Sequence, residues 1–276
     1  MKITVIGAGN MGGALAKGWF RAVSQTENKT NGLIQSAADI CVTARSQETL
    51  DRMKQQAPGI GVSNNNVEAI KGADLIVLAV KPWLVETVAH EIAPVIDAQR
   101  QIVCSVAAGV GTDKLTEYLC NPQTSKAPVC FYVMPNIAAE FGASMTFIAP
   151  SKEATHDQTE CVRKVFALVG DTSVCEEKMI GPGMMMAGCG IAYVMRFIRA
   201  QMEAGVEMGF YPKDALQIAL QTMDGAVQLL RQTGAHPEAA IDKVTTPGGT
   251  TIKGLNELDH AGFNSAVIRC LKAGLK

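Results

Sequence analysis

Residues 3–12 read Ile-Thr-Val-Ile-Gly-Ala-Gly-Asn-Met-Gly, an apolar run that leads directly into a glycine-rich turn. An amphipathic pattern follows over residues 13–23, so this stretch predicts a buried strand, a tight turn and a helix. In that context the spacing of Gly7, Gly9 and Gly12 is typical of a dinucleotide-binding turn, in which the helix N-terminus faces a pyrophosphate. Gly7 permits the turn, Gly9 lets the backbone approach the phosphates, and Gly12 lets the helix pack closely on the strand. The alternative is an ordinary strand–helix turn.

The first half of the chain alternates predicted strands with helical patterns. The five predicted strands are Lys2–Ile6, Asp39–Ala44, Asp74–Val80, Gln101–Val106 and Val129–Met134. Short apolar strands separated by helices predict a parallel sheet with helices on both faces. Two further strand-like runs, Ala143–Ala149 and Thr172–Glu176, flank a helical pattern at Ala154–Val169 and would extend the sheet. The polar stretch Gln25–Gly32 predicts a surface loop before the second strand.

The second half predicts helices only, at Met184–Met208, at Pro212–Thr233 and from Gly249 onward. The fold class expected is therefore α/β, with an N-terminal Rossmann-type doubly wound sheet over residues 1–177 and an all-α dimerisation domain over 178–276. The helix from Met184 is apolar on most sides, which indicates burial against a second subunit. Burial within the core of one chain is the alternative.

Composition excludes several classes of function. The chain has 276 residues and a net charge of −1, so nothing favours nucleic-acid binding. No apolar run reaches transmembrane length, so no membrane contact is expected. The eight cysteines form no Cys-x-x-Cys pair and the four histidines have no ligand spacing, so neither a disulfide framework nor a metal site is expected. Reduced, buried thiols are typical of a cytoplasmic protein.

The end of the second predicted strand indicates which cofactor binds. NAD enzymes place an acid there to bind the ribose hydroxyls, but this chain has Arg45 followed by Ser46. A guanidinium attracts a 2′-phosphate and offers it several donors. The sequence therefore favours NADPH, with NADH as the alternative, unless Arg45 is merely a solvated side chain.

Three further strand ends carry residues suited to a ligand crevice, because parallel strands end at the same edge of a sheet. They are Ala79-Val80-Lys81-Pro82, Ser105-Val106-Ala107-Ala108-Gly109 and Met134-Pro135-Asn136. Small residues at Ala107 and Ala108 let a flat ring approach, and Asn136 offers an amide for a nicotinamide carboxamide. Each could also be a simple strand–helix junction, but together they converge on one crevice.

The run Val244-Thr245-Thr246-Pro247-Gly248-Gly249-Thr250-Thr251-Ile252 opens a helical pattern with two glycines and four hydroxyls. Backbone N–H groups in such a turn form a binding site for a carboxylate. A capped helix start is the alternative, but a cap needs only one hydroxyl.

In their order along the chain these motifs resemble those of pyrroline-5-carboxylate reductases, and Val244–Leu255, VTTPGGTTIKGL, is similar to the signature segment of that family. The resemblance covers essentially the whole chain. It implies reduction of 1-pyrroline-5-carboxylate to L-proline with NAD(P)H, and a helical domain that forms a homodimer or a larger homo-oligomer. The cofactor residues implied are Gly7, Gly9, Asn10, Met11, Gly12, Arg45, Ser46, Asn66, Ala79, Val80, Lys81, Pro82, Ala107, Ala108 and Asn136. The substrate residues implied are Thr246, Gly248, Gly249, Thr250 and Thr251, with Thr251 as the catalytic residue.

Two segments depart from the family pattern. Ile137-Ala138 stands where the family usually has Thr-Pro, and Cys189 and Ile191 stand where it usually has Ser and Pro. Loss of the proline at Ile191 should leave a helix start less rigid.

Two other functions compete with imine reduction. A β-hydroxyacid dehydrogenase shares the Rossmann domain followed by helices, but that chemistry uses a lysine on the interdomain helix, and Gly183–Ala200 contains none. A protonated cyclic imine is already electrophilic and needs no strong acid nearby, so the absence of lysine favours the imine. A non-catalytic NADP-binding sensor or scaffold is the second alternative, and it would bind NADPH without turnover.

Overall fold

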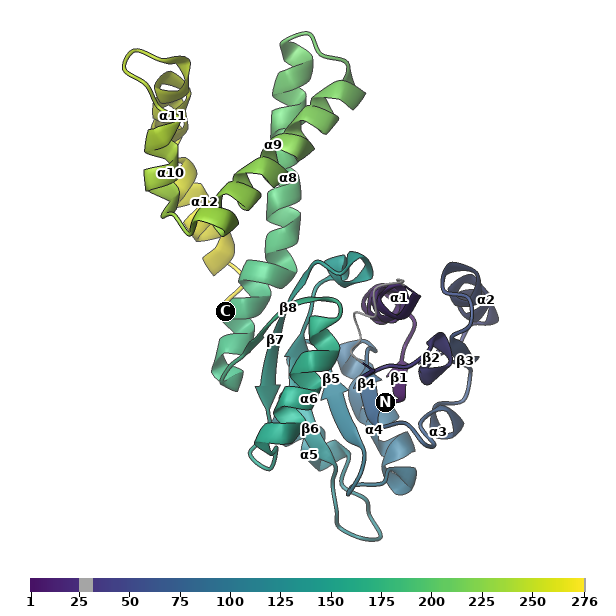
Figure 1. The fold of residues 1–276 in the computed structure, drawn as a ribbon. Coiled ribbons are helices and arrows are strands. Elements are labelled where there is room, and N and C mark those ends of the chain that lie inside the picture. Colours follow the sequence, from purple (N-terminus) through teal and green to yellow (C-terminus); the bar gives the residue numbers. More distant parts are fainter. Residues whose placement is uncertain (25–31, 276) are drawn as a thin grey trace. The chain divides into compact units, whose positions relative to one another are not determined.

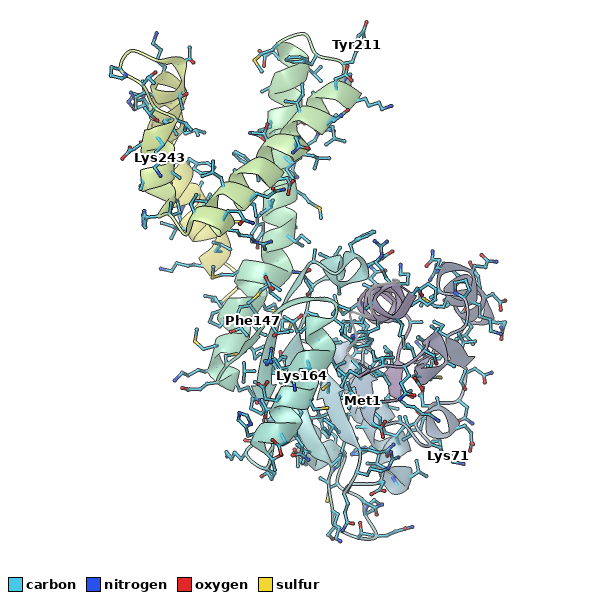
Figure 2. All side chains as sticks on the ribbon, viewed as in Figure 1. Met1, Lys71, Phe147, Lys164, Tyr211 and Lys243 are labelled. Carbon is cyan, nitrogen blue, oxygen red and sulfur yellow. The ribbon has the colours of Figure 1, made fainter. Side chains whose placement is uncertain are left out.

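The structure is a computed structural model that describes residues 1–24 and 32–275. It divides into two compact units, Met1–Gly188 and Cys189–Lys276. Figure 1 shows a sheet covered by helices in the first unit and helices alone in the second. The expected α/β class, a Rossmann-type sheet followed by an all-helical part, is confirmed. The loop predicted at Gln25–Gly32 lies outside the described residues except for Gly32, which forms a turn.

The sheet of the first unit has eight strands among the described residues, in the order β3-β2-β1-β4-β5-β6-β7-β8. The strands are β1 (Ile3–Ile6), β2 (Ile40–Thr43), β3 (Gly61–Ser63), β4 (Leu75–Leu78), β5 (Ile102–Ser105), β6 (Val129–Met134), β7 (Ser144–Pro150) and β8 (Gly170–Val174). All neighbouring strands pair in parallel except β6 and β7, which are antiparallel. The five strands predicted first and the two predicted extensions are all present. The sequence did not predict β3, because three residues are too short for a periodic signal.

Helices cover both faces of this sheet. They are α1 (Asn10–Ser24), α2 (Gln47–Gln56), α3 (Asn66–Ala69), α4 (Pro82–Ile92), α5 (Thr112–Tyr118), α6 (His156–Ala167) and α7 (Ile180–Gly183). Alternate strand residues enter two separate cores, as strand geometry requires. Val5 and Val77 pack with α1 and α6 in one core, whereas Ile6 and Leu78 pack with α4 and α5 in the other.

Helix α1, which follows the glycine turn, is held firmly on its face of the sheet. The Trp19 indole nitrogen donates to the Val165 carbonyl at 2.9 Å, and the indole ring meets Phe166 edge-on with centroids 5.5 Å apart. Trp19 and Phe166 are both fully buried. Burial of two large aromatic side chains of this kind stabilises the fold by roughly 1.5–3 kcal/mol each.

The second unit consists of α8 (Gly190–Glu207), α9 (Pro212–Thr233), α10 (Pro237–Lys243), α11 (Thr250–His260) and α12 (Phe263–Lys272). The first of these helices differs from its prediction. Helical backbone begins at Ile180 rather than Met184, and a π-helical segment, Met184–Cys189, joins α7 to α8. Ile191 is the second residue of α8, which continues directly from the π-helical segment. The predicted loss of rigidity at this helix start stays a prediction.

All eight cysteines are free thiols. Burial raises the pKa of the Cys130 thiol to about 12, so this thiol stays protonated and unreactive near neutral pH. None of the described helices is both long enough and apolar enough to cross a bilayer.

Candidate functional site

The strand order brings most of the predicted cofactor residues to one edge of the sheet. Strand β1 lies between β2 and β4, and β5 follows β4, all in parallel. Their carboxyl ends therefore meet at the same edge, where the strand order reverses and ligands of such folds bind. The glycine turn follows β1, Arg45 and Ser46 follow β2, Ala79–Pro82 follow β4, and Ala107 and Ala108 follow β5.

The three glycines of the turn differ in what surrounds them. Gly7 has a φ of +107°, and a Cβ there would lie 2.7 Å from the Ala79 carbonyl oxygen. A Cβ on Gly12 would lie 2.0 Å from the Gly7 carbonyl oxygen and 2.9 Å from the Cβ of Ala79. A Cβ on Gly9 would meet nothing within 4 Å. The fold itself therefore requires Gly7 and Gly12, whereas the space over Gly9 fits a ligand that approaches the backbone.

This difference predicts opposite outcomes for two alanine substitutions. Gly12→Ala should lower the free energy of unfolding by about 1–3 kcal/mol or more, because the added methyl overlaps rigid backbone. Gly9→Ala should leave stability unchanged and weaken NADPH about tenfold, because its methyl would occupy the position predicted for the phosphates. Urea unfolding and NADPH fluorescence titration measure the two effects. Equal stability of the two variants, or unchanged NADPH affinity in Gly9→Ala, would contradict this assignment.

The two residues after β2 are available to a ligand. Arg45 and Ser46 are both exposed, and Arg45 forms no ion pair or hydrogen bond in the described part of the chain. Ser46 is the N-cap residue of α2, and its hydroxyl makes no capping bond. A free guanidinium beside a free hydroxyl at a helix N-terminus suits a phosphate group.

Asn66 is fixed beside this region by two side-chain hydrogen bonds. Its Oδ1 accepts from the Thr43 hydroxyl at 2.7 Å, and its Nδ2 donates to Glu91 at 3.0 Å. Nearby, Lys81 is the exposed N-cap residue of α4, and Pro82 occupies the first helical turn, where its missing N–H costs nothing.

The Asn136 side chain, which was predicted to bind the cofactor, is buried and hydrogen-bonded within the protein. It is 8% exposed; its Oδ1 accepts from the Ala138 N–H at 3.0 Å, and its Nδ2 donates to the Ala187 carbonyl at 3.3 Å. One N–H and one oxygen lone pair remain for a ligand. Its part in binding nicotinamide stays a prediction.

The predicted substrate turn lies in the second unit, at the N-terminus of α11. Gly248 has a φ of +71°, Gly249 is the N-cap residue, and the Gly249 N–H donates to the Thr246 carbonyl at 2.9 Å. No side chain caps the helix, so its first N–H groups have no side-chain acceptor among the described residues. Thr250 and Thr251 form the exposed first turn. An uncapped helix start with hydroxyls on it can bind a carboxylate.

No role was predicted for Thr43 from the sequence, but in the structure it binds both the glycine turn and Asn66. Its carbonyl accepts from the N–H groups of Gly7 and Ala8 at 3.1 and 2.9 Å, while its hydroxyl holds Asn66. The side chain is 2% exposed. Only the pairing of β1 with β2 reveals this role, because no local motif marks the residue.

Two family models match the chain. One, described as pyrroline-5-carboxylate reductase dimerisation, matches residues 177–276. The other, described as NADP oxidoreductase, coenzyme F420-dependent, matches residues 2–109. Together they support a nicotinamide cofactor for the first unit and self-association through the second.

Two curated relatives bear the name of the same family, and a solved structure has the same fold. Pyrroline-5-carboxylate reductase 1 of Dictyostelium discoideum is 34% identical over 97% of this chain, which spans about half of that relative (47%). Pyrroline-5-carboxylate reductase of Escherichia coli strain K12 is 33% identical, covering 98% of this chain and 94% of that protein. The crystal structure of Plasmodium falciparum pyrroline carboxylate reductase with NADP bound has a TM-score of 0.83 at 24% identity, covering 99% of this chain and 95% of that one. These comparisons do not favour a dehydrogenase of β-hydroxyacids or a sensor.

Proposed function

The chain belongs to the pyrroline-5-carboxylate reductase family, and from this premise we propose which of its residues perform the reduction of 1-pyrroline-5-carboxylate to L-proline. The crevice at the carboxyl edge of β1, β2, β4 and β5 takes NADPH in preference to NADH. The Thr246–Thr251 turn takes the substrate carboxylate. Two observations carry this assignment: the open space over Gly9, and an Arg45 side chain that makes no ion pair or hydrogen bond among the described residues.

The reaction demands little acid–base chemistry from the protein. Bound NADPH supplies a hydride to an electrophilic carbon. The substrate C=N bond accepts that hydride at carbon once its nitrogen is protonated, so the product is a secondary amine and no oxygen-bound proton must be removed. The protein's task is to align donor and acceptor and to hold the carboxylate, and such alignment can lower a reaction barrier by roughly 7–11 kcal/mol. A turn with hydroxyls and N–H groups but no lysine or histidine suits this task.

Steady-state turnover tests the proposed function. NADPH oxidation should depend on 1-pyrroline-5-carboxylate and yield one proline for each NADPH consumed. Tight NADPH binding without turnover would instead identify a sensor. A cytoplasmic location and a functional boundary between residues 177 and 178 stay predictions.

We expect an obligate homodimer formed through the second unit. On α8, Val194 and Met195 are 48% and 51% exposed, and Met208, the C-cap residue that follows, is 74% exposed. An apolar cavity of about 230 Å³ lies between α8 and α9. Apolar surface of this extent is typical of interfaces rather than of monomer surfaces. Light scattering across a dilution series should show no folded monomer. A compact, active monomer would contradict this prediction.

A further inference from the structure

The loop that follows β5 is held at two points by side chains from outside the predicted cofactor motifs. It runs from Val106 to Gly111 and includes the exposed Ala108, one of the two small residues predicted to let a flat ring approach. Its first residue is paired to the neighbouring strand, since the Val106 N–H donates to the Leu78 carbonyl at 3.0 Å. Beyond that point the loop leaves the sheet and depends on other contacts.

The first of these contacts is the hydroxyl of Tyr132. The Gly109 N–H donates to the Tyr132 oxygen at 2.8 Å. Gly109 has a φ of +81°, a conformation that glycine tolerates and that turns its N–H toward β6. Tyr132 is only 8% exposed and packs in a small core with Ile180 and Ala149. The acceptor is therefore immobile, and it holds the middle of the loop in one place.

The second contact is the carboxylate of Glu177, at the far end of the loop. Glu177 accepts from the Thr112 N–H at 2.9 Å and from the Thr112 hydroxyl at 2.7 Å. It does so at the N-terminus of α5, where a negative charge is favourable. Gly111 leaves room for it, since a Cβ there would lie 2.0 Å from Oε1 of Glu177.

The carboxylate of Glu177 also acts on the Tyr132 hydroxyl. Burial raises the pKa of the Tyr132 hydroxyl, the Gly109 N–H opposes that rise, and the nearby Glu177 charge adds to it. Tyr132 therefore stays a neutral hydroxyl at neutral pH and keeps its own proton as a donor.

We propose that Tyr132 and Glu177 are positioning residues for hydride transfer, because they fix the Val106–Gly111 loop and through it the nicotinamide ring. This inference rests on the proposed function. A loop that is ordered before the cofactor binds costs no ordering free energy on binding. It also holds the nicotinamide carbon at a fixed distance from the substrate carbon. Small changes in that distance strongly change the rate of hydride transfer. Neither residue touches the reacting atoms.

The matched pair Tyr132→Phe and Tyr118→Phe tests the proposal in the full-length protein. Both remove one phenolic hydroxyl, but the Tyr118 hydroxyl makes no hydrogen bond in the described part of the chain, and its ring lies edge-on to His90 at 5.7 Å. The probes are NADPH and 2′,5′-ADP, which has the adenosine phosphates but no nicotinamide. A second readout is the kinetic isotope effect on kcat with NADPH deuterated at the transferred position.

We expect Tyr132→Phe to weaken NADPH and lower kcat, each about threefold to tenfold, the size typical of one lost hydrogen bond. The affinity for 2′,5′-ADP should stay unchanged and the isotope effect should rise, whereas Tyr118→Phe should match the parent in every measurement. Glu177→Ala should act in the same direction as Tyr132→Phe, and Glu177→Gln, whose amide oxygen still accepts from Thr112, should restore the parent values. If Tyr132→Phe fails to fold, the comparison of Glu177→Ala with Glu177→Gln tests the proposal instead.

Unchanged NADPH affinity, kcat and isotope effect in Tyr132→Phe would overturn the proposal. An equal loss of 2′,5′-ADP affinity would also overturn it, because a general weakening of the domain affects both ends of the cofactor. Failure of the proposed function is distinguishable, since the parent protein itself would then show no turnover.

Discussion

Replacing Thr251 by alanine is expected to lower kcat with 1-pyrroline-5-carboxylate by about ten- to a thousandfold. Thr251 lies in the exposed first turn of α11, whose start no side chain caps. Its hydroxyl can donate to the ring nitrogen as charge changes there, so the interaction strengthens in the transition state and its loss appears in kcat. NADPH affinity should stay unchanged, because the cofactor motifs belong to the other unit. Steady-state kinetics and a separate NADPH titration measure both quantities.

Two neighbouring substitutions serve as controls for Thr251. Thr250→Val should keep most of the activity, because the backbone N–H at that position remains. Gly249→Val should raise KM steeply, because a Cβ there would lie 2.6 Å from the Thr246 hydroxyl and would crowd the carboxylate turn. Intact turnover in Thr251→Ala would refute the assignment, as would a loss of NADPH binding in all three variants.

Replacing Arg45 by alanine should weaken NADPH by about ten- to a hundredfold and leave NADH unaffected. A charge-assisted hydrogen bond to a phosphate contributes roughly 1.5–3 kcal/mol, which corresponds to that range. Arg45 is exposed and unpaired within the described residues, so the substitution breaks no contact inside the protein. The selective loss follows because only NADPH carries the 2′-phosphate.

Arg52→Ala is the matched control for Arg45. Arg52 is an exposed arginine on α2, so its removal changes the net charge equally without touching the end of β2. It should weaken NADPH only slightly, and less at higher salt. If Arg45→Ala weakened NADPH and NADH alike, Arg45 would not be the residue that reads the 2′-phosphate.

Short sequence patterns predicted the turns, the strand ends and the starts of several helices. The glycine turn, the strand ends and the helix start at Gly249 each carry their signal within about ten residues, as the periodicity and turn rules require. Strand β3 was missed because three residues have no period, and the π-helical segment because its residues also fit an ordinary apolar helix. The helix was predicted to begin at Met184 instead of Ile180 because Gly181, Pro182 and Gly183 have poor helix propensities.

Contacts between distant residues could not be predicted. Tyr132 and Gly109 are 23 residues apart, and Glu177 and Thr112 are 65 apart, so their hydrogen bonds exist only once the order of β5, β6 and β7 is known. The same holds for Asn136 and Ala187, which are 51 residues apart. Sequence reasoning therefore predicted which strand ends meet at one edge of the sheet, but not which side chains hold those ends in place.

The central claim is that this chain moves a hydride from NADPH to the imine carbon of 1-pyrroline-5-carboxylate. Mass spectrometry of the product formed with NADPH deuterated at the transferred position tests this claim most directly. The account predicts L-proline that carries one deuterium at the carbon formerly double-bonded to nitrogen, formed in proportion to the cofactor oxidised. Cofactor oxidation without labelled proline, or NADPH binding with no reaction, would contradict it.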